Sequence, residues 1–326
     1  MMTIQHGDNM KDNHEQVSVL ALNPSVDISY EIPQLLAYQK VRASQTWYHP
    51  GGNGINITRA LVELGVPTNC CSIIAGESGD LLLKLLGDSL GDRLNSFRVD
   101  GETRLNTTIM QQSQPGQFEI TSVGPEVPAD ALASACDCFV NVADNGIAVL
   151  SGLLPPGAPE NTYRELIERV NRKGGKAVVD AHGEPLQQAL EAKPWMVRLN
   201  HYVLEITMKR RMDTREQVAE VARGIQQQGV EYVCVTLGDK GAVLLDADNS
   251  YHCEAPRIHK QSTVGCGDSL VAGLIATALK NETAQQMLRF GVICGSATAS
   301  HPGTELFSRD ELETESTELE VTALGI

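Results

Sequence analysis

Short apolar runs alternate with longer segments of helical periodicity along most of the chain. The first run, VSVLAL at residues 17–22, is continuous and rich in branched side chains, which is typical of a strand buried on both faces of a parallel sheet. Further strand-like runs lie at 147–151, 177–181, 231–237 and 241–248. Helical spacing of apolar residues recurs at 54–64, 80–90, 160–173, 214–228, 268–280 and 283–300. Strands that alternate with helices of this length predict an α/β fold with a mainly parallel sheet and helices on both faces.

Two polar segments do not follow this alternation. Residues 27–50 include DISYEI and VRASQTWYH, and residues 102–123 read ETRLNTTIMQQSQPGQFEITSV. Both segments alternate in short pieces, as half-exposed strands do. They predict a small sheet that stands off the main body.

The two ends of the chain are polar. Residues 1–16 lack the apolar core of a signal peptide and are expected to be disordered, and the acidic segment DELETESTELEVTALGI is expected to form a solvated helix and tail. No apolar stretch approaches the roughly 18 residues that a transmembrane helix needs. The eight cysteines include no C-x-x-C pair and no Cys/His cluster at zinc spacing. These features predict a reduced, cytoplasmic protein without a membrane partner.

Charge narrows the classes of partner. The formal net charge is -15, with 26 Lys and Arg residues against 41 Asp and Glu residues. A field of this sign repels nucleic acids and anionic membrane surfaces. A phosphate-bearing ligand would therefore need a local basic pocket, so basic residues beside glycine-rich turns are informative.

The signatures of several common enzyme classes are missing. The sequence contains no G-x-x-x-x-G-K-[ST] motif, no G-x-G-x-x-G after the first strand and no G-x-S-x-G element. A P-loop protein, a dinucleotide dehydrogenase and a serine hydrolase of the α/β class are therefore disfavoured.

The segment STVGCGDSLVAG at 262–273 places a glycine turn where a helix begins. The first amides of that helix, with those of Gly265, Cys266 and Gly267, lack intrahelical partners and form an anion site. Asp268 at this position has two interpretations. It caps the helix, or it is a general base beside a cradle for a transferring phosphoryl group. This segment alone leaves both open.

A second glycine turn, PGGNGIN at 50–56, also opens a helix. It is either a tight turn with residues at positive φ or a place where a sugar approaches the backbone, with Asn56 offering a donor and an acceptor to hydroxyl groups.

Four motifs together carry a resemblance to a known family. They are LALNPSVD at 20–27, PGGNGIN at 50–56, SGLLPPG at 151–157 and STVGCGDSLVAG at 262–273. In order and spacing they resemble the phosphofructokinase-B family of ribokinase-like sugar kinases, from about residue 17 to about residue 308. NPSVD, YQKVRA, ETRLN and QSTVGCGDS are similar to its phosphosugar branch, which comprises minor 6-phosphofructokinases, 1-phosphofructokinases and tagatose-6-phosphate kinases.

The resemblance implies a three-layer ribokinase-like α/β fold over residues 17–326. Its central sheet is mostly parallel, and a small β-sheet lid is built from about 27–50 and 102–123. The lid is also the expected contact of a homodimer. The implied reaction is ATP-dependent phosphorylation of a phosphorylated ketohexose, with fructose 6-phosphate giving fructose 1,6-bisphosphate, and with Mg²⁺ as cofactor. Phosphorylation of fructose 1-phosphate or tagatose 6-phosphate is the alternative.

The same resemblance implies a set of site residues. Asp268 is the general base, and the amides of Gly265, Cys266 and Gly267 form the anion cradle. Asp27 binds ring hydroxyls, and the phosphate already on the substrate is held by Lys40, Arg42 and Arg104. The other residues expected around the sugar are Gly51, Gly52, Asn56 and Ser151. Those expected around ATP are Asn200, Thr236, Gly238, Gly241, Thr263 and Val264.

One element departs from the family pattern. The family usually reads Lys-Pro-Asn-x-x-Glu, whereas this chain reads RLNHYV, with Arg198 at the lysine position and Val203 at the glutamate position. A valine cannot help to hold Mg²⁺. Two outcomes remain open, a kinase with weaker metal affinity or a sugar-phosphate-binding pseudokinase. Cys266 at a helix N-terminus also suggests a thiol of lowered pKa that is sensitive to oxidation.

Overall fold

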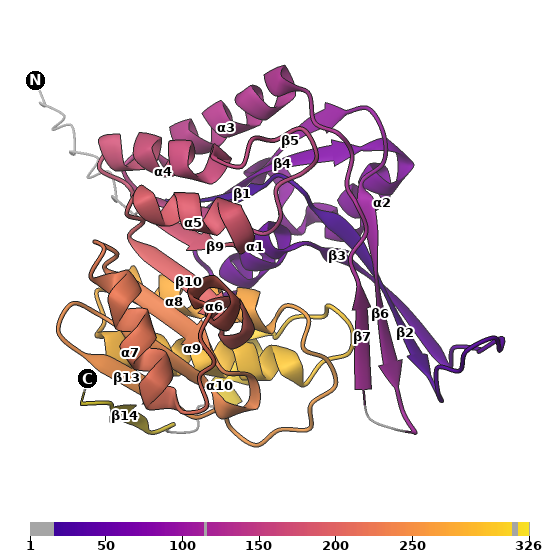
Figure 1. Ribbon diagram of the computed structural model, residues 1–326. Coiled ribbons are helices and arrows are strands. Elements are labelled where there is room, and N and C mark those ends of the chain that lie inside the picture. The colour runs from indigo at the N-terminus through magenta and orange to yellow at the C-terminus, as the bar shows by residue number, and fades with distance from the viewer. Residues whose placement is uncertain (1–15, 114–115, 315–318, 326) are drawn as a thin grey trace, which may run out of the picture.

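The apolar runs form a large, mostly parallel sheet in the computed structural model, which describes residues 16–113, 116–314 and 319–325 (Figure 1). Within these residues the sheet has ten strands. In spatial order they are β14 (Val321–Ala323), β13 (Ser250–Cys253), β12 (Ala242–Leu245), β11 (Tyr232–Thr236), β10 (Met196–Asn200), β9 (Lys176–Asp180), β8 (Ile147–Ser151), β1 (Val17–Ala21), β4 (Thr68–Ala75) and β5 (Leu94–Val99). The strands from β11 to β5 in this order run parallel, and β12, β13 and β14 add an antiparallel edge.

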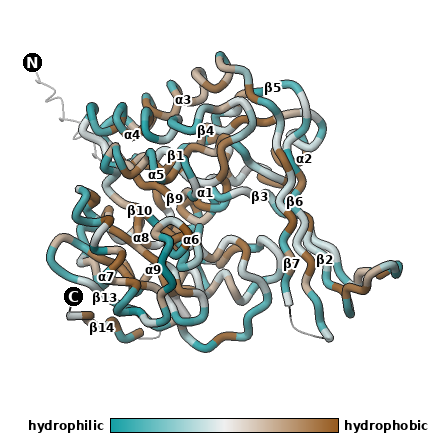
Figure 2. The backbone as a smooth tube through the Cα atoms, viewed as in Figure 1, coloured by the Kyte–Doolittle hydropathy of each residue, from teal (hydrophilic) through white to brown (hydrophobic). Residues whose placement is uncertain are grey.

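Helices cover both faces of this sheet, because successive residues of its strands face opposite sides. Val17 and Val19 of β1 pack into one core with α1, α8 and α9, whereas Leu20 packs into the other core with α3, α4, α5 and α7. Figure 2 shows α3 and α4 with alternating hydrophobic and hydrophilic colours, as expected of helices that bury one face. The helices are α1 (Asn53–Glu63), α2 (Gly76–Leu86), α3 (Ala129–Ala143), α4 (Thr162–Arg172), α5 (Gly183–Glu191), α6 (His201–Met208), α7 (Arg215–Gln226), α8 (Cys266–Ala278), α9 (Ala284–Ala299) and α10 (Arg309–Thr314). The three-layer α/β fold is confirmed.

The second sheet, here called the lid, has four strands in the described part of the chain. They lie in the order β3 (Gln45–Gly51), β2 (Ser25–Ile32), β6 (Arg104–Gln111) and β7 (Gly116–Ile120). These strands fall within the two polar segments or overlap them, so the small sheet predicted from them is present. It projects from the large sheet as the long ribbons of Figure 1.

The strand register gives the lid two unlike faces. Asp27 is opposite His49 and Asn106, so these side chains share the face with Ser25 and Ser29. The opposite face carries large apolar side chains that are about half exposed, namely Tyr48, Leu105, Phe118 and Ile120. We call these the polar face and the apolar face of the lid.

The ends of the chain differ in part from expectation. Residues 1–15 of the expected disordered extension lie outside the described residues. The acidic C-terminal segment contributes α10 as a helix, but Val321–Ala323 then pairs with β13 as strand β14 rather than forming a solvated tail. No helix in the described ranges has the length and apolarity to span a membrane.

Candidate active site

Four polar residues end parallel strands of the large sheet at the same edge. Ser151 of β8 is in register with Asp180 of β9, and Asn200 of β10 is in register with Thr236 of β11. The strand order turns back at β1, which lies between β8 and β4. Ligands of open α/β sheets bind at the carboxyl edge near such a point. The edge is therefore the natural place for a site.

Helix α8 starts above this edge with a glycine turn. Gly265 is its N-cap and has a φ of 81°, in the left-handed region that favours glycine. At Gly267 an added Cβ would lie 2.2 Å from a guanidinium nitrogen of Arg198, so a side chain there would displace the guanidinium. The amides of Gly265, Cys266 and Gly267 thus form the start of a helix in a crowded polar pocket, which suits an anion.

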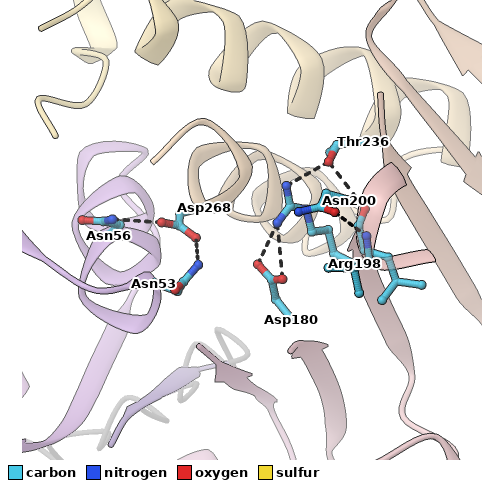
Figure 3. Close-up of polar contacts among 9 residues, drawn as sticks. Asn53, Asn56, Asp180, Arg198, Asn200, Thr236 and Asp268 are labelled. Atoms are coloured by element: carbon cyan, nitrogen blue, oxygen red, sulfur yellow. Dashed lines mark hydrogen bonds and ion pairs between the residues drawn. The ribbon is translucent and has the colours of Figure 1, made fainter. Parts of the chain in front are cut away.

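Asp268, in the first turn of α8, is buried with an exposed fraction of 4%. Its two carboxylate oxygens each accept a hydrogen bond of 2.9 Å, one from Asn53 and one from Asn56 (Figure 3). Burial and the nearby Asp180 carboxylate raise the pKa of Asp268 to about 7. Within the described part of the chain, the side chain accepts from α1 and from no amide of its own helix, so it does not act as the cap of α8.

Arg198 lies between Asp180 and the start of α8. Its Nη1 is 3.3 Å from both Asp180 oxygens, and its Nη2 donates to the Thr236 hydroxyl at 2.9 Å (Figure 3). Although burial opposes its charge, the Asp180 and Asp268 carboxylates hold the pKa of Arg198 above its usual value. A permanent cation is thereby fixed beside the anion cradle.

A cleft of about 770 Å³ opens on one side of this cradle. Its lining includes five of the residues expected around ATP, and Cys266 and Gly267 of the cradle. The five are Asn200, Thr236, Gly238, Gly241 and Thr263. The sixth, Val264, follows in the same loop and donates its amide to the Ser262 hydroxyl. The volume lies in the usual range of small-molecule sites.

Helix α1 links Asp268 to the lid, because Asn56 donates to Asp268 and Arg59 of the same helix donates to the Pro50 carbonyl oxygen of β3. Asp27 is buried, and its carboxylate accepts hydrogen bonds from Ser25, Asn106 and Thr304. A Cβ at Gly51 would overlap the Asp27 carboxylate, and Gly52 has a φ of 88°. Of the three glycines of PGGNGIN, Gly51 thus leaves room for the Asp27 carboxylate, and Gly52 has a backbone conformation that favours glycine.

Two further residues expected at the sugar carry polar atoms without partners. The Ser151 hydroxyl and the Arg104 Nη1 are buried and have no hydrogen-bond partner among the residues that the structure describes. Arg104 donates through its Nε to the Asn23 carbonyl oxygen at 3.1 Å. Buried orphans are rare in proteins, and a bound ligand is one explanation for them.

Lys40 and Arg42 lie elsewhere. Both are exposed in the connection between β2 and β3, the dark loop at the far end of the lid in Figure 1. Arg104, by contrast, lies buried at the base of the lid, where it pairs in register with Ser25. The structure therefore does not bring the three basic residues together within one chain.

The lid is joined to the body at the loop before α8. Gln117 of β7 donates to the Thr263 hydroxyl at 3.0 Å and accepts from the Thr263 amide at 3.1 Å, and the same hydroxyl is 3.4 Å from Glu119. The lid thus contacts the loop that leads into the anion cradle, and we call this pair of hydrogen bonds the lid latch.

The departing element forms the start of α6. Asn200 caps this helix by accepting the Val203 amide at 2.7 Å, and Val203 packs partly against the core. Glu205 instead accepts the Met212 amide at 2.7 Å, so its carboxylate is engaged in the next loop. In the described ranges no group of three His, Cys, Asp or Glu side chains is placed to hold a metal ion.

The lowered pKa expected of the Cys266 thiol is wrong. Burial and the neighbouring Asp268 carboxylate raise the pKa of this thiol to about 12. The cost of desolvating a thiolate at this half-buried position outweighs the stabilisation from the helix N-terminus.

Several residues of the site were not identified from the sequence. Asn53 lies in PGGNGIN and donates to Asp268, and Thr304 lies in the late segment HPGTELF and donates to Asp27. Neither contact can be predicted from the motif, because each partner is distant in the sequence. Asp180 is the last residue of β9, and its position near the end of a predicted strand was the only feature of the sequence that could have identified it as a site residue. Asn106 and Gln117 belong to the lid, where an alternating pattern does not tell which face looks inward.

Comparison with known proteins places this chain in a family. Residues 20–311 match the pfkB family carbohydrate kinases. The chain is 30% identical over 300 residues to the ATP-dependent 6-phosphofructokinase isozyme 2 of Escherichia coli (strain K12), covering 91% of this chain and 97% of that protein. It is 29% identical to the 1-phosphofructokinase of Bacillus subtilis (strain 168), covering 94% and 100% of the two chains. The crystal structure of Escherichia coli phosphofructokinase-2 in complex with substrates and products superposes with a TM-score of 0.87 at 30% identity, covering 92% and 97%.

Proposed function

The chain belongs to the pfkB family of carbohydrate kinases and is an ATP-dependent sugar kinase, and on that premise we propose that it phosphorylates the C1 hydroxyl of fructose 6-phosphate. The relatives named above act on fructose phosphates, and they support a phosphosugar as the acceptor. The observation that carries the proposal is the position of Asp268. It lies buried at the start of α8, beside the cleft expected to hold ATP, and α1 links it to the lid.

The proposed reaction uses Asp268 as general base. Its carboxylate accepts the proton of the C1 hydroxyl, and the hydroxyl oxygen forms a bond to the γ-phosphorus of ATP. The bond from that phosphorus to the β–γ bridging oxygen breaks, and ADP leaves. The amides of Gly265, Cys266 and Gly267 donate to the equatorial phosphoryl oxygens, where negative charge must be stabilised.

Arg198 adds a fixed positive charge to the same place. Its guanidinium lies against Gly267 and is held by Asp180 and Thr236, so little reorganisation is needed when a phosphate arrives. We propose that Mg²⁺ would be held chiefly by the ATP phosphates and would neutralise their charge there, because Val203 has no oxygen to offer as a ligand and the Glu205 carboxylate accepts the Met212 amide. A pseudokinase is disfavoured, since the base and the cradle are both complete.

The acceptor site is proposed to lie between Asp27, Ser151 and Arg104. Asp27 accepts from ring hydroxyls, the unpartnered Ser151 hydroxyl contacts the sugar, and the free Nη1 of Arg104 binds an oxygen of the ligand. A panel of fructose 6-phosphate, fructose 1-phosphate and tagatose 6-phosphate, read by ADP release, tests the choice of substrate. Faster turnover of either of the latter two would overturn the assignment. An Asp268→Asn variant should lose about 10²- to 10⁴-fold in kcat, and near-normal turnover would contradict the base role.

The apolar face of the lid supports a homodimer. Tyr48, Leu105, Phe118 and Ile120 are between 43% and 59% exposed, and together they form one face that a second lid would cover. In such a dimer Lys40 and Arg42 at the lid tip of one chain are proposed to complete the phosphate site of the other chain.

Mixing two inactive variants tests this shared site. Asp268→Asn keeps an intact lid tip, and a Lys40→Ala/Arg42→Ala double variant keeps an intact base. If each site draws its base from one chain and its tip from the other, mixed dimers regain turnover at low sugar concentration. No recovery after subunit exchange, or a monomer by sedimentation, would contradict the shared site.

A further inference from the structure

Two asparagine side chains hold the Asp268 carboxylate, and both come from the first turns of α1. Asn53 and Asn56 are three residues apart, so their side chains lie on one face of that helix. Their amide nitrogens donate to Oδ1 and Oδ2 of Asp268 at 2.9 Å each (Figure 3). Each carboxylate oxygen keeps a further lone pair, which leaves room to accept the proton of a substrate hydroxyl.

The surroundings indicate which end of the Asn56 amide meets Asp268. The Asn56 oxygen is 3.5 Å from Nη1 of Arg59, which also donates to the Pro50 and Thr304 carbonyl oxygens. With its oxygen near a cation, Asn56 presents its nitrogen to the carboxylate. The Asn53 oxygen lies beside Gly152, where an added Cβ would be only 3.3 Å away.

Both contacts are donated to Asp268, because an ionised carboxylate only accepts and must therefore meet the two amide nitrogens. Two donated hydrogen bonds favour the carboxylate over the protonated acid. They also orient the carboxylate plane, because one donor occupies each oxygen. Asn56 lies within the proposed sugar site, whereas Asn53 was not assigned any role there.

We propose that Asn53 is a positioning residue of the phosphoryl transfer, which together with Asn56 keeps the base Asp268 deprotonated and aimed at the acceptor hydroxyl. This inference rests on the proposed function, since it requires Asp268 to be the base. The motif PGGNGIN then supplies the base with its two donors, and Gly152 of SGLLPPG leaves the space that the Asn53 side chain occupies.

Other groups facing Asp268 bear on the same protonation. Asp180 of β9 raises the pKa of Asp268, whereas Arg198 of β10 lowers it. On α8 itself the Cys266 thiol has a pKa raised to about 12 and stays neutral in the working range. The variants below leave these three groups unchanged.

The test is the pH profile of kcat/KM between about pH 5.5 and 9.5, a range that brackets the Asp268 pKa of about 7 and extends further on its alkaline side. It uses fructose 6-phosphate, or the phosphosugar of the panel that is turned over fastest. In the unmodified enzyme the acid limb is expected near pH 7. Asn53→Ala should move it up by about one unit, since a hydrogen bond to a charged group is lost, and activity should recover well above the limb. Asn53→Asp should move it further, because a second carboxylate repels the first.

Asn171→Ala is the matched control, since this exposed asparagine donates only to the carbonyl oxygens of Ala192 and Lys193 among the contacts of the described residues. Its profile should match that of the unmodified enzyme. A loss for Asn53→Ala that is equal at every pH, or one confined to the KM of the sugar, overturns the inference. Asp268→Asn measured in parallel separates the two failures. If that variant keeps its turnover, the proposed function has failed; if it is inactive and the limb of Asn53→Ala has not moved, only the role of Asn53 has failed.

Discussion

Replacing Asp268 by asparagine is expected to make the protein more stable above pH 7 while abolishing most of its activity. The pKa of Asp268 is about 7 in the folded chain, against an ordinary value of 3.8. Between these two values the folded chain holds a proton that the unfolded chain has released. The free energy of unfolding therefore falls as the pH rises through this window, and it does not change below the lower value.

The size of the effect follows from the shift. About three pKa units correspond to roughly 4 kcal/mol of stability lost by about pH 8, with a slope of about 1.4 kcal/mol per pH unit. An asparagine carries no charge and avoids this loss. Its side chain has one oxygen, however, so it keeps one of the two hydrogen bonds from Asn53 and Asn56 and loses the other, which costs about 1–2 kcal/mol. The net gain is expected to be about 2–3 kcal/mol at pH 8 and close to zero at pH 5.

Urea unfolding at pH 5, 6, 7 and 8, followed by the fluorescence of Trp47 and Trp195, measures this difference. The free energy of Asp268→Asn minus that of the unmodified chain should rise with pH and level off above pH 7. Asp100→Asn, which changes an exposed carboxyl group, should show no such rise. A difference that stays constant across the four pH values, or a variant that is less stable at pH 8, would refute the reasoning. It would show that burying the ionised Asp268 carboxylate does not lower the free energy of unfolding.

Three other changes test separate parts of the site. Val203→Glu restores an acidic side chain beside Asn200 and should lower the Mg²⁺ concentration for half-maximal rate several-fold; an unchanged Mg²⁺ titration would mean that the valine has no bearing on the metal. Gln117→Ala removes the lid latch to Thr263 and should raise both the KM for the sugar and the rate of ATP hydrolysis in the absence of sugar. A variant that loses kcat with both of these quantities unchanged would show that the latch has no part in lid closure. Cys266→Ser should keep kcat within about a factor of two, because the cradle uses backbone amides, and loss of turnover would show that the thiol itself takes part.

Much of the large sheet could be predicted because its strands are continuous apolar runs. VSVLAL, IAVLS and AVVDA each became buried parallel strands within a residue or two of the expected bounds. The strand at Thr68–Ala75 was not expected, since TNCCSIIA begins with polar residues that are nevertheless packed inside. Helix Ala129–Ala143 also escaped prediction. Its buried face consists partly of small residues, which give a weak apolar period.

The expected helix at 80–90 begins earlier, at Gly76. Its N-terminal amides are satisfied by Glu102, whose carboxylate accepts from the amides of Glu77 and Ser78. That partner lies about 25 residues away in the sequence, so no local capping signal marks the start of the helix. A helix boundary that depends on a side chain distant in the sequence cannot be predicted from the pattern of neighbouring residues.

The sequence by itself determined the fold class and the family, and it singled out Asp268 as the candidate base. Apolar periodicity indicates which faces of the helices and strands are buried, and glycines indicate turns with a backbone conformation that favours glycine. The four motifs could therefore be identified from the sequence. The tertiary structure alone decided what surrounds the base. Asn53 and Asp268 are 215 positions apart, and Asp27 meets Thr304 across 277 positions. Such contacts depend on how the sheet, the lid and α8 pack, and that packing is a property of the whole chain rather than of any segment.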